Sequence, residues 1–142
     1  MKIQPYVIFD GRCDEALEFY KAAVGAKVIT LMRFKDSPER PPSGEFPPEV
    51  LNKVMHASMQ IGDTTVMASD GRCTGQAKFS GITLTLSVTS DAEAERLFAA
   101  LADGGTVSMP LAKTFFSSRF GKLADRFGVP WMILVQATGH PV

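Results

Sequence analysis

The chain has 142 residues, 15 basic and 15 acidic side chains and no formal net charge. This length fits one compact domain, and the balanced charge gives no footprint for nucleic acid or an anionic membrane. The short apolar run after Met1 predicts neither a signal peptide nor a membrane span, so we expect a soluble, cytoplasmic protein. Cys13 and Cys73 have neither zinc-site spacing nor the density of a disulfide scaffold, which predicts reduced thiols.

The first half of the sequence has the pattern of a strand, a helix, a strand, a long loop and a hairpin. The helix is indicated by apolar residues that recur at helical spacing from Ala16 to Val24, and Gly25 ends it. The hairpin is indicated by alternating residues on either side of Gly62-Asp63. The expected ranges are 5–9, 14–24, 27–34, 36–52 for the proline-rich loop, 54–61 and 64–68.

The second half repeats this order. Polar and apolar residues alternate over 82–88, which predicts a strand, and Ser90 with Glu93 forms the pattern of a capping box at the start of a helix. Gly104-Gly105 ends that helix. The remaining strands are expected at 106–109, 114–119 and 131–135.

The order is therefore βαβββ twice, which suggests a duplicated unit within a single domain. Module one spans about residues 1–70 and module two about 80–136. We expect an α+β fold.

Two tandem βαβββ modules resemble the vicinal oxygen chelate superfamily, which includes glyoxalase I, extradiol dioxygenases, fosfomycin-resistance proteins and bleomycin-binding proteins. The resemblance is closest to its PhnB-like branch. It implies that the two modules form a curled mixed-sheet cup, as in other glyoxalase-like proteins. The segments that carry the resemblance are Pro5-Tyr6, Cys13–Ala16, Phe19-Tyr20, His56-Ala57, Ile61–Asp63, Met67–Asp70 and, most specifically, Phe120–Ile133.

The resemblance also implies where a metal would bind, because metal-using members place four His or Glu ligands on strands that face the cup. Here the corresponding places hold Gln4 or Pro5, Met67, Thr83 and Met132. Zinc, iron, nickel and manganese rely on imidazole, thiolate or carboxylate ligands, which thioethers and threonine hydroxyls do not replace. We therefore expect no metal and no cofactor.

His56 is the strongest candidate for a catalytic residue, because imidazole titrates near neutrality and can act as an acid or a base. It shares a strand face with Ser58 and Gln60. The alternative is a histidine that forms a structural hydrogen bond or faces solvent.

The residues expected to bind a ligand lie in both modules. Hydroxyls would hold a polar ligand, thioethers would give flexible apolar walls, and an aromatic cluster beside Arg119 and Lys122 would cover an apolar ligand while a cation meets an acidic group. Packing and solvated charge are the alternatives. The predicted substrate-binding residues are Met67, Thr83, Thr85, Phe115, Arg119 and Met132.

The function is expected to be metal-independent binding of a small molecule. The alternatives are a lyase, isomerase or transferase that uses His56, or a metal-dependent enzyme with atypical ligands. No glycine-rich strand-to-helix loop supports a nucleoside cofactor for methyl transfer. We also expect a homodimer, because members of this superfamily commonly pair.

Overall fold

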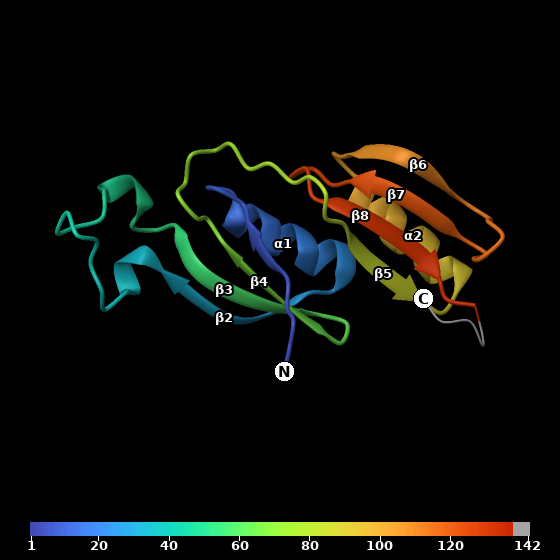
Figure 1. Cartoon of the computed structure of the whole chain (residues 1–142), viewed down its shortest axis with the longest axis horizontal. Coiled ribbons are helices and arrows are strands. Elements are labelled where there is room, and N and C mark those ends of the chain that lie inside the picture. Colours follow the sequence, from blue (N-terminus) through green and yellow to red (C-terminus); the bar gives the residue numbers. More distant parts are fainter. Residues whose placement is uncertain (138–142) are drawn as a thin grey trace. The chain divides into compact units, whose positions relative to one another are not determined.

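Two four-stranded sheets, each with one helix, make up the chain in a computed structural model that describes residues 1–137 (Figure 1). The first sheet belongs to unit 1, Met1–Ala77, and the second to unit 2, Lys78–Val142. Both are mixed sheets with open edges. The predicted α+β fold with tandem βαβββ modules is confirmed.

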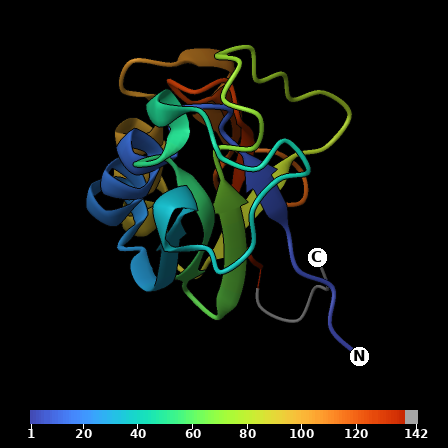
Figure 2. The ribbon, with the colours of Figure 1, turned by 90° about the vertical axis from the view of Figure 1, so that its left-hand side faces the viewer.

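Unit 1 has the strand order β1-β4-β3-β2, in which β1 runs parallel to β4 and the other neighbours are antiparallel. Helix α1 lies along one face of this sheet (Figure 2). Its apolar stripe, which includes Leu17 and Tyr20, is buried together with Ala57 and Met59 of β3. The bounds are β1 (Tyr6–Ile8), α1 (Cys13–Val24), β2 (Lys27–Arg33), β3 (Val54–Ile61) and β4 (Thr64–Ser69).

The start of α1 is capped from a distant part of the chain. The N-cap residue Arg12 makes no side-chain cap. Instead, the carboxylate of Asp70, which is 0% exposed, accepts hydrogen bonds from the amides of Gly11 at 3.0 Å, Cys13 at 2.7 Å and Val54 at 2.7 Å. A carboxylate is favourable at a helix N-terminus. Asp70 therefore ties the end of β4 to the starts of α1 and β3.

Unit 2 repeats the topology with the strand order β5-β8-β7-β6, in which β5 runs parallel to β8 and the other neighbours are antiparallel. Helix α2 covers one face of the sheet (Figure 1). Its Ser90 side chain accepts a hydrogen bond from the Glu93 amide at 3.2 Å, as the capping pattern predicts. The bounds are β5 (Leu84–Val88), α2 (Asp91–Ala102), β6 (Thr106–Ala112), β7 (Phe120–Ala124) and β8 (Pro130–Val135).

The core of unit 2 lies between α2 and the sheet. Leu101 of α2 and Ile133 of β8 are fully buried. Gly121 gives the helix room to approach, because a Cβ atom at this position would lie 2.7 Å from Cε2 of Phe98. Residues 121, 123, 131 and 133 therefore face the helix, and the residues between them face away.

A buried carboxylate also organises the turn between β7 and β8. Asp125 accepts hydrogen bonds from the amides of Phe127 at 2.9 Å and Val129 at 3.1 Å, and from the indole Nε1 of Trp131 at 2.9 Å. The turn and Trp131 of β8 therefore depend on the same carboxylate, which accounts for the occurrence of Asp125 and Trp131 in this segment.

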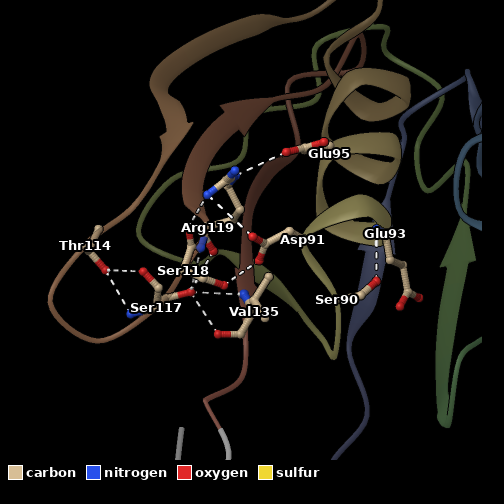
Figure 3. A network of polar contacts seen from close by, with 9 residues as sticks. All are labelled: Ser90, Asp91, Glu93, Glu95, Thr114, Ser117, Ser118, Arg119 and Val135. Carbon is tan, nitrogen blue, oxygen red and sulfur yellow. Dashed lines mark hydrogen bonds and ion pairs between the residues drawn. The ribbon is translucent and has the colours of Figure 1, made fainter.

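Two expectations about local structure need correction. The strand expected at residues 114–119 is wrong, because Ser and Thr side chains there satisfy the backbone locally and compete with strand pairing. The Thr114 hydroxyl accepts from the Ser117 amide at 3.1 Å, and the Ser117 hydroxyl donates to the Val135 carbonyl at 2.8 Å (Figure 3). The strand begins instead at Phe120. The loop over 36–52 also contains a short 3-10 helix, Pro48–Val50.

Within the described residues, neither helix has the length and hydropathy that a bilayer-spanning segment needs.

Candidate functional site

Each sheet has one face that carries no helix, which we call the helix-free face. In unit 1, a row of paired residues crosses this face from β1 to β2. Tyr6 pairs with Met67, Met67 with Ser58, and Ser58 with Thr30. The hydroxyls of Thr30 and Ser58 lie 2.8 Å apart. The row therefore places a half-exposed thioether between a phenol and two hydroxyls.

The equivalent row in unit 2 has a different composition. Thr85 pairs with Met132, Met132 with Lys122, and Lys122 with Met109. Met132 takes the place of Met67, since β8 corresponds to β4 in the repeated topology. The structure thus brings together two residues predicted to bind a ligand, Thr85 and Met132, and adds Lys122. Thr83, also predicted, lies just before β5 and is exposed.

The side chains in these rows do not fit the metal centre of the superfamily. In these rows, Tyr6 and Thr85 take the places for which Gln4 or Pro5 and Thr83 were expected. Together with the two methionines they offer a phenol, a threonine hydroxyl and two thioethers, none of which is a usual ligand of a divalent transition metal. Among residues 1–137, no three His, Cys, Asp or Glu side chains gather in a way that could hold a metal ion.

His56 lies on the helix-free face of unit 1, half-buried on β3, and it has a partner. The Tyr6 hydroxyl is 3.1 Å from its Nδ1, and the two rings are 5.5 Å apart between centroids. This partner could not be found from the sequence, because the two residues are 50 positions apart. Strands β1 and β3 bring them together on one face of the sheet, on either side of β4.

A cleft of about 740 Å³ lies in unit 2, where the β6–β7 connection meets the end of β8. Leu134 lies on the helix-free face, opposite Phe120 of β7. The wall of the cleft is partly aromatic, and the rest of its lining combines apolar, hydroxyl and amide groups with the ammonium of Lys113. The lining residues are Lys113 to Ser118 and Leu134 to Ala137.

The predicted aromatic cluster is present and borders this cleft. Phe115 and Phe116 stack edge-to-face with centroids 5.1 Å apart, and Phe116 and Phe120 do the same at 5.1 Å. Phe115 is 100% exposed and Phe116 45% exposed. Phe120 also precedes Lys122 by two residues on one strand face, so the cluster connects the cleft to the row of unit 2.

Arg119, the cation predicted to bind a ligand, has other partners. Its guanidinium forms ion pairs with Asp91 at 3.5 Å and Glu95 at 3.2 Å, both on α2, and it donates to the Ser118 carbonyl (Figure 3). Ligand binding by Arg119 stays a prediction. The positive charge of Arg119 is paired with two carboxylates. By contrast, the residues paired with Lys122 on the neighbouring strands include no Asp or Glu.

The two cysteines are free, and neither has the environment of an activated nucleophile. Burial, together with the nearby charge of Asp70, raises the pKa of the Cys13 thiol to about 12. Burial also raises the pKa of Cys73, with Asp70 again adding to the effect. A raised pKa keeps both sulfurs protonated and unreactive near neutral pH.

Comparisons with known proteins agree with this fold and with these motifs. The model of a family described as 3-demethylubiquinone-9 3-methyltransferase matches residues 1–134. Protein YjdN of Escherichia coli (strain K12) is 37% identical over 143 residues, which cover 95% of this chain and 95% of that protein.

Two solved structures are similar over nearly the whole chain. Protein PA1353 from Pseudomonas aeruginosa is 41% identical, with a TM-score of 0.81 over 96% of this chain and 98% of that one. The PhnB protein from Bacillus cereus is 26% identical, with a TM-score of 0.76 over 95% of this chain and 99% of that one.

The tandem βαβββ units have the fold of the vicinal oxygen chelate superfamily. The chain belongs to the PhnB-like family, whose model is the one described as 3-demethylubiquinone-9 3-methyltransferase.

Proposed function

We propose that this chain is a metal-independent small-molecule-binding protein and that the ligand binds on the helix-free face of unit 2. The observation that carries the proposal is the cleft of about 740 Å³. Phe120 packs against Phe116 of the cleft lining and precedes Lys122 by two residues on the same strand face. Ligand sites are typically concave, with apolar walls and a few placed polar groups, and this volume is in their usual range.

The exposed phenylalanines support a binding role. Phe115 is fully exposed, and Phe116, which its ring meets edge-to-face, is 45% exposed. An exposed aromatic pair beside a cleft is a typical feature of a surface that buries a ligand. Met132 and Met109 supply flexible thioether walls that adapt to the shape of a bound molecule.

The test is fluorescence titration with N-phenyl-1-naphthylamine, a neutral apolar probe. We expect saturable enhancement with the wild-type chain and roughly 5- to 10-fold weaker affinity for the double variant Phe115→Ala/Phe116→Ala, which is about 1–1.4 kcal/mol. Ile82→Ala is the matched control, because it truncates another exposed apolar residue of unit 2, 75% exposed, outside the cleft lining. Absence of saturable enhancement, or equal affinity for all three proteins, would contradict the proposal.

A second function, favoured by the contact between Tyr6 and His56, is acid or base catalysis on the helix-free face of unit 1. A hydrogen bond at Nδ1 orients the imidazole and leaves Nε2 available to a substrate. Met67 and Ser58 of the same face provide an apolar and a hydroxyl contact. The reaction would be of the lyase, isomerase or transferase type.

Once a substrate is found by screening, two variants separate this function from a structural role. His56→Ala should abolish turnover and leave the melting temperature nearly unchanged. Tyr6→Phe keeps the ring contact, removes the hydroxyl and should lower kcat more than it raises KM. An unfolded His56→Ala protein, together with full activity in Tyr6→Phe, would assign the histidine to structure.

The activity named in the family description is not the one we propose. The connections from β1 to α1 and from β5 to α2 are short, and Gly11 is the one glycine in them. A nucleoside cofactor is usually held by a glycine-rich loop between a strand and a helix. Calorimetric titration with S-adenosylmethionine tests this directly, and saturable binding would favour methyl transfer.

We also propose that the chain is a cytoplasmic homodimer. Two free cysteines suit a reducing compartment. The edge strand β2 exposes Ile29 at 60%, Leu31 at 41% and Met32 at 39%, which is a typical surface for association with a second copy. Light scattering should give the mass of two chains, and a mass of one chain at micromolar concentration would contradict the dimer.

A further inference from the structure

We propose that the site in unit 2 selects anionic ligands, specifically carboxylates attached to an apolar or aromatic body, and that Lys122 supplies the matching charge. This inference rests on the proposed function, because it names the class of molecule that the same face would bind. Lys122 is then a specificity-determining residue, and its ammonium contacts the ligand carboxylate.

The first support is the position of Lys122. It lies on the inner strand β7, between Met132 on one side and Met109 on the other. It is half-buried rather than extended into solvent. Lysine side chains are mostly exposed, and buried ones are usually paired with an opposite charge.

The second support is the absence of a counterion within the part of the chain that the structure describes. At the paired positions of the helix-free face of unit 2, Lys122 is the one ionisable residue. Its ammonium has no hydrogen bond or ion pair with any residue in the range 1–137. By contrast, Arg119 meets Asp91 and Glu95 on the opposite side of the sheet. Arg119, on the helix side of the sheet, is thus neutralised by the protein itself, whereas Lys122, on the helix-free face, is available to a ligand.

The third support is the apolar surface at a fixed distance from this charge. Phe120 lies two residues from Lys122 on the same strand face, which corresponds to about 7 Å along a strand. Phe120 pairs with Leu134 and stacks on Phe116, both of which line the cleft. A ligand that reaches both regions therefore needs a charged group roughly one aromatic ring away from its apolar body.

The charge balance favours a carboxylate over a phosphate. One ammonium is matched by one negative charge, and a lysine acts as a point charge rather than as a bidentate fork. Thr85, across Met132 in the same row, offers a hydroxyl to the second oxygen or to a neighbouring polar group of the ligand. Lys113 in the cleft lining is the competing cation, and the experiment must separate the two.

The test compares 2-naphthoate with 2-naphthamide, which share shape and differ in charge, by isothermal titration calorimetry at low salt. We expect the wild-type chain to bind the carboxylate about 5- to 10-fold more tightly than the amide. Lys122→Met keeps the aliphatic stem and should bind both equally, and Lys122→Arg should restore most of the preference. Lys113→Met is the matched control and should keep the preference.

The possible failures are distinguishable. Equal binding of the two molecules by the wild-type chain, or a preference lost in Lys113→Met and kept in Lys122→Met, overturns the role of Lys122 and leaves the proposed function standing. If neither naphthoate nor naphthamide nor the neutral naphthylamine probe binds, the proposed function fails, and this inference fails with it. Melting curves of all variants confirm that each is folded.

Discussion

The two units have the same strand order and carry a methionine at the same place, yet the surroundings of that methionine differ. Met67 lies between Tyr6 and Ser58, and Met132 lies between Thr85 and Lys122. Unit 1 thus presents a phenol and an imidazole, and unit 2 presents a cation beside an aromatic cleft. The two units thus share a topology, and their helix-free faces differ in chemistry.

The units also differ in how each helix is anchored. Helix α2 uses the adjacent residue Ser90, a local cap that the sequence pattern reveals. Helix α1 uses Asp70, which is 57 positions from Cys13 in the sequence. The distant cap fixes strand ends and a helix start at once, so unit 1 should depend on a single side chain far more than unit 2 does.

The first prediction, with the largest expected effect, compares the loss of each helix cap. Asp70→Ala leaves three amides without their acceptor, two of them at the helix start, and should lower the free energy of unfolding by roughly 3–5 kcal/mol. Ser90→Ala, the matched change in unit 2, should cost about 1 kcal/mol. Urea denaturation measures both, and equal losses would show that the distant cap is not special.

The second prediction concerns the hairpin turns, because only the turn of unit 2 is organised by a buried carboxylate among the described residues. The β3–β4 hairpin turns at Gly62-Asp63, whereas the β7–β8 turn is built around the buried Asp125. Asp125→Ala should cost about 2–4 kcal/mol, because two amides and the Trp131 indole lose their acceptor. The emission of Trp131, the sole tryptophan, should also change. Asp63→Ala should change stability by less than about 0.5 kcal/mol.

The third prediction uses the raised pKa of Cys13. Below about pH 9 the thiol is protonated in both the folded and the unfolded chain, so it contributes no pH dependence. Between about pH 9 and the folded-state pKa of about 12, the unfolded chain loses the proton and the folded chain keeps it. The free energy of unfolding should therefore fall by about 1.4 kcal/mol per pH unit through this thiol.

Denaturation at pH 8, 9 and 10 measures this slope. Cys13→Ala removes the thiol from both states and should show a smaller decrease over the same interval. Identical slopes for the two proteins would contradict the buried, unreactive state of Cys13.

The fourth prediction, with the smallest expected effect, tests Arg119. Its ion pairs with Asp91 and Glu95 involve side chains that are more than a third exposed, so solvent weakens them. Arg119→Gln should cost less than about 1 kcal/mol and leave binding of 2-naphthoate unchanged. Loss of binding with unchanged stability would instead assign the ligand charge to Arg119, as the sequence suggested.

Much of the fold could be predicted from the sequence because its signals are local. Period-two alternation located β3 and β5, helical spacing located α1 and α2, and the Ser90 pattern located a cap. The strand expected at 114–119 failed because Thr114 and Ser117 bond the backbone themselves, an effect that composition does not reveal.

The candidate site was harder to predict, because it depends on pairings between distant residues. The sequence predicted that Thr85 and Met132 bind a ligand, but not that they are paired or that Lys122 lies next to Met132. The sequence also favoured Arg119 over Lys122 as the ligand-binding cation. The two cannot be told apart until the structure shows that Asp91 and Glu95 of α2 pair with Arg119. The contact of His56 with Tyr6 was hidden for the same reason.

The most direct test of the difference between the units is a methyl NMR titration of the chain labelled at its methionine methyl groups, with 2-naphthoate as ligand. Single Met→Leu variants assign the signals. We expect the signals of Met132 and Met109, on either side of Lys122, to shift together and saturably, while that of Met67 stays unchanged. A shift confined to Met67, with Met132 and Met109 unmoved, would contradict a binding site on unit 2.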